Sequence, residues 1–463
     1  MRSSWKGKMG FIQAALIATC AVATAASAQQ QTTPATSPDK PAETGQGARP
    51  AGVAGAPLPG MAQIGPTREI KIAEYTWFRF GAQVQAWYKA AQDRNTGGTN
   101  EGSYAQDFYC RRCRFFTTGS VVKDVYFNVL FEAGNFGKGD VATGAKTDGT
   151  ARILDAYGQV KFAQWFWFSG GSILMPLTRN GLQPTTTYVS IDNANIDTTP
   201  VLQGNSFVLR DLGFQANGFF ADNHVEYRFG VFQGSRQAPA PGAGQTASHN
   251  APRFVAMVSA NLWDTETGYV NGGHYFGTKR VLGIMGNWDY QQFRKDSPSI
   301  GGTAATVGVD KNAYMGLSGA IFLNLPLAGP KMTGGDEIVA LLQFGIYDGG
   351  FTQNATGVTT NPGTYPNVLK QTNYLAEAGY YNHAGHFSVF GKFEKRKISD
   401  DYVAALKTAS NQTWIAGGVK YYVAPANFMN FALQYERINN DDAPSTQQGG
   451  TNNITFQMQT ILY

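Results

Sequence analysis

Apolar and polar residues alternate along most of this chain. In the stretch TWFRFGAQVQAWY, the apolar Phe80 and Val84 occupy even-numbered positions and the polar Gln83 an odd-numbered one. Such a period of two gives an extended strand one apolar and one polar face, because successive side chains point to opposite sides. Sixteen segments of this kind predict an all-β chain. They lie at 72–88, 108–119, 124–134, 152–162, 165–176, 207–220, 224–233, 253–262, 279–290, 312–325, 337–348, 371–382, 386–397, 411–423, 427–438 and 452–463.

The connections between these segments alternate in length. Those after odd-numbered segments are mostly long and rich in Gly, Asn, Thr or Pro, whereas those after even-numbered segments are mostly short, such as 163–164. Two even connections, 263–278 and 326–336, are longer than the others. Transmembrane β-barrels have an even strand number, long loops at the extracellular end and short turns at the periplasmic end. The pattern therefore predicts a transmembrane antiparallel β-barrel of about 16 strands.

Composition supports the barrel. Aromatic residues make up 13% of the chain and charged residues 15%, whereas soluble domains carry about 25% charged residues. No run of 18 apolar residues follows the N-terminal leader, which argues against membrane-spanning helices. Three cations of the leader leave with it, so a net charge of +5 falls to about +2 (5 − 3 = 2). A charge this small gives no reason to expect nucleic acid as a partner.

The N-terminus reads as an export signal. Residues 1–28 have a basic start, an apolar stretch and a small-residue cleavage site at Ala26–Ala28, as in secretory signal peptides. Residues 29–66 are rich in Pro, Ala, Gly and Gln and predict a disordered periplasmic lead-in, because they have few large apolar side chains to bury. Residues 67–463 are expected to form the barrel in the outer membrane of a Gram-negative bacterium.

Three stretches carry a family likeness. They are RRCRFFTTGSVVKDVYFNVLFEAG, ILDAYGQVKF with the GGSILMPL that follows it, and RDLGFQANGFFADNHVEYRFGVFQG. Over about 108–234 the chain resembles the phosphate-selective porin O and P family. The resemblance implies a sixteen-stranded barrel, usually trimeric, that conducts small solutes. Ser172 and Leu174 stand where the family has Gln and Lys.

Strand phase indicates which charged side chains face the barrel interior. A charge on the lipid face costs about 2–4 kcal/mol near the midplane, so the polar phase must point inward. The pore-lining cations predicted in this way are Arg79, Arg112, Arg114, Lys161, Arg228, Lys392, Arg396 and Lys420. The predicted anions are Glu132, Asp155, Glu226, Asp289, Glu377, Glu394 and Glu436.

The predicted cations cluster on one wall. The last four strands and the first two carry six of the eight, so we expect a field across the pore. An alternative is that these residues are ordinary ion pairs across strands. Arg111 falls on the lipid-facing phase and is expected near the outer interface, where a long side chain can reach water.

The connection 177–206 is the longest in the chain. A long structureless connection in a compact domain is usually functional, and the family resemblance implies that this loop folds into the barrel. We therefore expect a constriction in which Arg179, Asp192 and Asp197 of the loop face the basic wall.

The motif YCRRCRFF contains Cys110 and Cys113. In a regular strand, residues three apart have Cα atoms about 10 Å apart, whereas a disulfide requires less than about 7 Å. Either the strand bulges and a disulfide forms near the extracellular rim, or both thiols stay free. No zinc ligand set surrounds the pair, and His383 and His386 fall in a predicted turn. Neither a metal nor a cofactor is expected.

These observations favour a porin for passive diffusion of small hydrophilic solutes, with an anion preference left open. The expected partners are outer-membrane lipid and two further copies of the chain. Two other functions stay open: an outer-membrane barrel enzyme, for which His249 is the one histidine near a predicted rim, and a barrel scaffold for a periplasmic partner. An enzyme would need a Ser/His/acid constellation at the rim, and a scaffold would need a lumen wide enough for a protein.

Overall fold

The structure is a computed structural model. It describes residues 69–92, 102–139, 145–146, 151–198, 209–234, 251–292, 313–331, 334–349, 368–400, 411–423, 428–441 and 450–462. The predicted signal peptide, the predicted lead-in and His249 lie outside the described residues. Among the described residues, no helix is long and apolar enough to cross a membrane.

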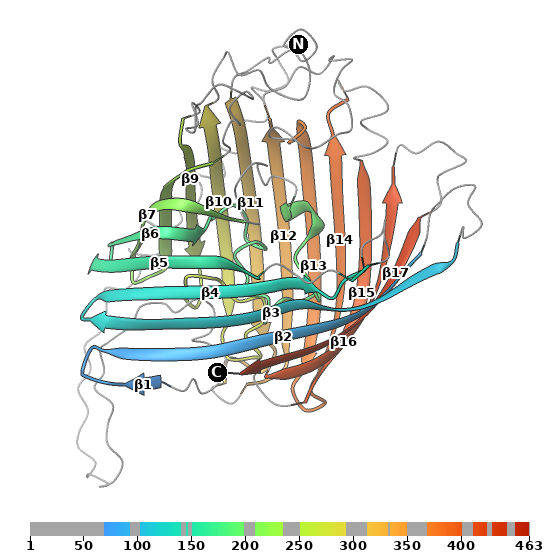
Figure 1. Cartoon of the computed structure of the whole chain (residues 1–463), viewed down its shortest axis with the longest axis horizontal. Coiled ribbons are helices and arrows are strands. Elements are labelled where there is room, and N and C mark those ends of the chain that lie inside the picture. The colour runs from blue at the N-terminus through green and yellow to red at the C-terminus, as the bar shows by residue number, and fades with distance from the viewer. Residues whose placement is uncertain are drawn as a thin grey trace.

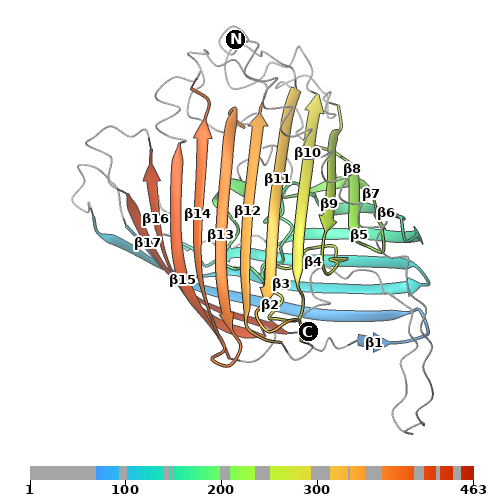
Figure 2. The same cartoon turned by 180° about the vertical axis from the view of Figure 1, so that it is seen from behind.

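Sixteen antiparallel strands, β2 to β17, close into a barrel (Figures 1 and 2). Each strand pairs with its sequence neighbour, and β17 pairs with β2 to close the ring. A three-residue strand, β1, pairs with the start of β2. The strands are β1 (Glu69–Lys71), β2 (Trp77–Gln92), β3 (Tyr104–Val122), β4 (Val125–Phe136), β5 (Ala151–Ala163), β6 (Phe166–Leu174), β7 (Arg210–Phe220), β8 (Val225–Phe232), β9 (Arg253–Asn261), β10 (Val281–Gln292), β11 (Ala313–Pro326), β12 (Glu337–Asp348), β13 (Gln371–Asn382), β14 (Phe387–Ile398), β15 (Gln412–Tyr422), β16 (Met429–Asn440) and β17 (Thr451–Leu462). Each of the sixteen predicted segments corresponds to one barrel strand, which confirms the predicted fold class.

Burial in the barrel is the reverse of burial in a soluble protein. Large apolar side chains are exposed on the outer face, for example Phe115 at 67% and Phe80 at 56%. Polar side chains on the alternate positions are buried, for example Gln85 at 0% and Arg112 at 5%. An apolar outer face around a polar interior is the arrangement that suits strands surrounded by lipid.

Two segments fill the barrel interior. One is the connection after β6, residues 175–198, which carries the short 3-10 helix η1 (Asn195–Thr198). Seen from both sides, this segment lies between the front and back walls (Figures 1 and 2). Its apolar side chains, including Leu182 and Ile191, join the largest buried apolar cluster together with Val255 and Val339 of the strands.

The second segment is the connection after β9, residues 262–280, which enters from the opposite end of the barrel. Residues 271–277 are buried throughout. Gly277 has a φ of 75°, and a Cβ atom there would lie 2.4 Å from the backbone of Gly335. The backbone of segment 262–280 thus packs directly on the connection between β11 and β12. The two even-numbered connections that the sequence shows as long are therefore the ones that pack together at this end.

Candidate functional site at the barrel constriction

The inward segment 175–198, here called the constriction loop, is held in shape by its own polar groups. The backbone N–H of Gly181 donates to Thr178 Oγ1 at 3.0 Å, and the N–H of Leu182 donates to the carbonyl of Thr178 at 3.1 Å. The N–H of Ala194 donates to Asn180 Oδ1 at 2.9 Å. These bonds close the loop on itself, so it presents fixed groups to the walls around it.

One side of the loop faces a cavity lined with arginines. A cavity of about 130 Å³ remains between the loop and strands β2 to β7. On its loop side lie Thr185, Thr186 and Tyr188. Five guanidinium groups surround it on the strand side, and we call them the arginine wall. They belong to Arg111, Arg112, Arg114, Arg152 and Arg210.

Three carboxylates pair with the arginine wall. Glu132 binds Arg114 at 2.6 Å and Arg152 at 3.0 Å, and Asp155 binds Arg210 at 3.2 Å. The third is Asp192 of the constriction loop. Five guanidinium groups against three carboxylates leave a net charge of +2 (5 − 3 = 2) beside the cavity.

Asp192 lies in a fork formed by two consecutive arginines. Arg111 Nε donates to Asp192 Oδ2 at 3.0 Å, and Arg112 contacts the other carboxylate oxygen. Burial raises the pKa of Asp192, but the two guanidinium groups outweigh this and hold that pKa below its ordinary value. The loop is thus tied to β3 by a charged, ionised contact.

Two of the five arginines reach the cavity because of β-bulges. In the register of the two strands, Gln85 of β2 pairs with Arg112 and the next residue, Ala86, pairs with Cys110. Arg111 is therefore the extra residue of a bulge and is skipped in the pairing with β2. The pairing of β4 with β5 also shifts in register, between Leu130 and Phe131 of β4. This shift lies next to the position of Arg152 in β5. A bulge changes the phase of a strand, which turns both arginines inward. The prediction that Arg111 lies on the lipid-facing side is therefore wrong, and the predicted cations also omitted Arg152 and Arg210.

The opposite side of the loop is bonded directly to strands β12 to β16. The N–H of Ile196 donates to Glu394 Oε2 at 3.1 Å, and the N–H of Ser190 donates to Glu377 Oε1 at 3.0 Å. We call this side the anchor wall. Each of its residues forms a hydrogen bond with the loop, and they are Gln343, Glu377, Glu394, Lys420 and Glu436.

The segment 262–280 braces the loop from the other end of the barrel. Arg179 of the loop binds Glu266 at 2.8 Å, and both side chains are buried. Arg228 of β8 donates to the carbonyl of Tyr269 at 2.7 Å. The N–H of Gly273 donates to Thr187 Oγ1 at 3.0 Å. Segments from both ends of the barrel therefore meet inside it.

The other predicted cations lie on the inner face but away from the cavity. The Arg79 guanidinium lies 4.9 Å from the centre of the Trp77 ring, and Lys161 Nζ lies 4.9 Å from the Trp167 ring. Arg396 donates to Gln412 at 2.9 Å. Three more are buried in pairs or beneath the inward segments, namely Arg228 with Glu226, Lys392 with Glu394, and Lys420 with the loop carbonyls.

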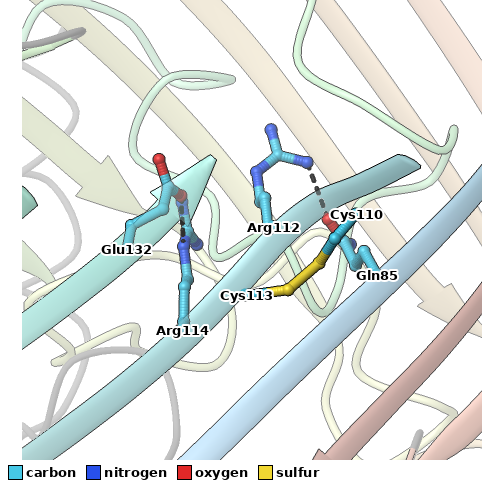
Figure 3. Close-up of a disulfide and its surroundings, with 6 residues drawn as sticks. All are labelled: Gln85, Cys110, Arg112, Cys113, Arg114 and Glu132. Carbon is cyan, nitrogen blue, oxygen red and sulfur yellow. Dashed lines mark hydrogen bonds and ion pairs between the residues drawn. A yellow bond between two sulfur atoms is a disulfide. The ribbon is translucent and has the colours of Figure 1, made fainter. Parts of the chain in front are cut away.

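The cysteines form a disulfide. Cys110 and Cys113 are joined, with their Cα atoms 6.2 Å apart, so the bulged alternative applies (Figure 3). The bond does not lie at the rim, because these residues pair with Ala86 and Val84 in the middle of β2. Beside it, Arg112 bonds Gln85 and Arg114 bonds Glu132 (Figure 3). The described residues contain no group of three or more possible metal ligands.

Solved structures provide the remaining comparison. The outer membrane channel DcaP of Acinetobacter baumannii matches over 85% of this chain and 99% of its own, with 10% identity and a TM-score of 0.50. OmpF of Salmonella typhi, in complex with daunomycin, matches over 85% and 100%, with 11% identity and a TM-score of 0.49. An anion-selective porin from Comamonas acidovorans matches over 83% and 99%, with 11% identity and a TM-score of 0.49. No protein-family model and no curated protein sequence matches the chain. The likeness to the first of these structures shows the fold, a closed antiparallel β-barrel.

Proposed function

We propose that the protein is an outer-membrane porin through which small hydrophilic solutes diffuse passively, with a constriction that prefers anions. The observation that carries the proposal is the arginine-lined cavity beside the constriction loop. The apolar outer face supports residence in a membrane. The family resemblance over 108–234 supports a homotrimer surrounded by outer-membrane lipid and membership of the phosphate-selective porin O and P family.

The anion preference follows from charge in a confined space. Two unit charges 4 Å apart interact by about 4 kcal/mol at an effective dielectric constant of 20, against about 1 kcal/mol in water. Salt screens charges over about 8 Å at physiological ionic strength, which exceeds the distance from a solute in the cavity to the nearest arginine. A net charge of +2 there should therefore favour anions.

The lumen disfavours a scaffold for a threaded protein. Both inward segments lie across the described interior and bond to each other there. A polypeptide could pass only if both were displaced. The described residues offer no specific observation in favour of a barrel enzyme.

The test is electrical. Purified protein is inserted into planar bilayers under a gradient of KCl, and the reversal potential is measured. We expect its sign to show chloride crossing faster than potassium. The variant Phe115→Leu, which changes only an exposed outer-face side chain, is the control and should behave as the parent. A reversal potential of the opposite sign would refute the anion preference, and the absence of channels would refute the porin.

Localisation is tested separately by cell fractionation. The protein is expected in the outer-membrane fraction, with a shift in gel mobility on heating. Recovery of soluble protein from the periplasm would refute the membrane assignment.

A further inference from the structure

The disulfide and the bulge in β3 depend on each other. Arg111 has no partner on β2, so both cysteines lie on the outer face while Arg111 and Arg112 both reach the interior. In a regular strand, Cα atoms three residues apart lie about 10 Å apart, too far for a disulfide. The observed 6.2 Å is reached only with the bulge.

The neighbouring strand accommodates the same irregularity. Asn135 of β4 has a φ of 57°, and its side-chain oxygen lies 3.4 Å from an Arg111 guanidinium nitrogen. On the other side, the Arg111 guanidinium lies 5.5 Å from the centre of the Trp87 ring. Arg111 is therefore held between its neighbours, with its hydrogen-bonding edge directed at the constriction loop.

The position of Asp192 depends on this arrangement. With β3 unbulged, Arg111 would point to the outer face and Arg112 alone would hold the Asp192 carboxylate. Bonds between a guanidinium and a carboxylate are among the stronger hydrogen bonds in proteins. The loss of one of two such partners should loosen the segment around Asp192 while leaving the anchor wall intact.

We propose that the Cys110–Cys113 disulfide is a positioning device for the constriction. Closed on the outer face of the barrel, it keeps the bulge that turns Arg111 inward, and Arg111 with Arg112 then fixes Asp192 and the loop. The disulfide thus acts on the pore without touching the solute. Its effect on conduction rests on the proposed porin function, whereas its effect on loop order does not.

The experiment measures amide hydrogen exchange in the loop peptide 182–196 of the purified, assembled protein. The double variant Cys110→Ser/Cys113→Ser and the variant Arg111→Ala should each raise exchange around Asp192 about tenfold, the size expected for loss of one charge-assisted hydrogen bond. The triple variant should add nothing further, because the disulfide acts through Arg111. Phe115→Leu, an outer-face change in the same strand, should leave exchange unchanged.

Several outcomes would overturn the proposal. One is unchanged loop exchange in the serine variant while Arg111→Ala raises it. Another is an additive rise in the triple variant, which would show that the two act separately. If the serine variant fails to assemble, exchange is measured on assembled parent protein reduced with tris(2-carboxyethyl)phosphine, with reduction verified by mass, and unchanged exchange would again refute the proposal.

Reversal potentials of the same variants separate this proposal from the porin function. Both the serine variant and Arg111→Ala should shift the potential towards cations. If no variant and no parent protein forms channels while the exchange pattern holds, the porin function fails and the positioning role stands.

Discussion

The arginine wall and the anchor wall face the same loop with charged side chains, yet they contact it differently. The arginine wall binds loop side chains, namely Asp192 through Arg111 and Arg112, and Thr185 through Arg114 at 2.9 Å. The anchor wall binds mainly loop backbone groups, as Glu377 and Glu394 do. The arginine side borders the cavity of about 130 Å³ beside the loop.

The comparison shows that facing inward and lining a passage are different properties. Lys420 is on the inner face, as its strand phase predicts, but its ammonium group donates to the carbonyl of Ser190 at 2.8 Å and is buried. Such a cation compensates loop backbone dipoles and does not line the cavity beside the arginine wall. Arg114 is bonded as well, but it borders open space. The predicted set of pore-lining residues thus mixes two roles that mutation can separate.

The largest expected effect, on single-channel conductance, comes from removing part of the constriction loop, which both walls contact. Shortening the constriction loop by deletion of residues 183–190 should raise single-channel conductance, because it removes the group of side chains that narrows the barrel beside the arginine wall. Planar-bilayer recordings measure it. Assembly is checked by heat-dependent gel mobility. Unchanged conductance in assembled protein would mean that the narrowest point lies elsewhere, with segment 262–280 the next candidate.

Removal of charge from the arginine wall should change selectivity. The double variant Arg112→Ala/Arg114→Ala should shift the reversal potential towards cations, since it removes two positive charges from a narrow passage. Glu132 keeps Arg152 and Asp192 keeps Arg111 as partners, so the barrel should still assemble. The matched control is Arg79→Ala/Lys161→Ala, which removes the same charge at a distance from the cavity. Equal shifts in both pairs would refute a local role for the arginine wall.

A change in the anchor wall should alter stability and loop order more than selectivity. Breaking a buried ion pair typically costs about 3–5 kcal/mol, and Glu394→Ala removes the partner of Lys392 together with the acceptor for Ile196 N–H. We expect a lower unfolding temperature and noisier open-channel current, with a reversal potential close to that of the parent. A selectivity change as large as that of the arginine pair would contradict the division into two walls.

The smallest expected effect is a dependence of loop docking on pH. Burial raises the pKa of Asp197 to about 7, above the ordinary value of an aspartate. The folded state therefore binds a proton more readily than the unfolded chain, so this contribution to stability is greatest in acid and is lost as pH rises through about 7. Loop amide exchange should be slower at pH 5 than at pH 8 after correction for intrinsic rates. Asp197→Asn should remove this difference, and its persistence would assign it to another group.

Much of the fold could be predicted from the sequence, but only part of the site. All sixteen strands followed from alternation, because lipid outside and polar contacts inside impose a period of two on every strand. The disulfide followed as one of two alternatives, since the spacing of Cys110 and Cys113 permits it only with a bulge. Arg111 and Arg152 were missed because each depends on the register between two neighbouring strands, which alternation within a single strand does not reveal.

The sequence by itself determined the closed barrel, its strand order and the inward phase of Arg112, Arg114 and Lys420, because these depend on local periodicity and on the cost of charge against lipid. The tertiary structure decided which of those side chains border the cavity. That outcome depends on where the constriction loop and segment 262–280 lie within the barrel, and so on contacts between residues far apart in the chain, such as Ile196 with Glu394 and Arg179 with Glu266.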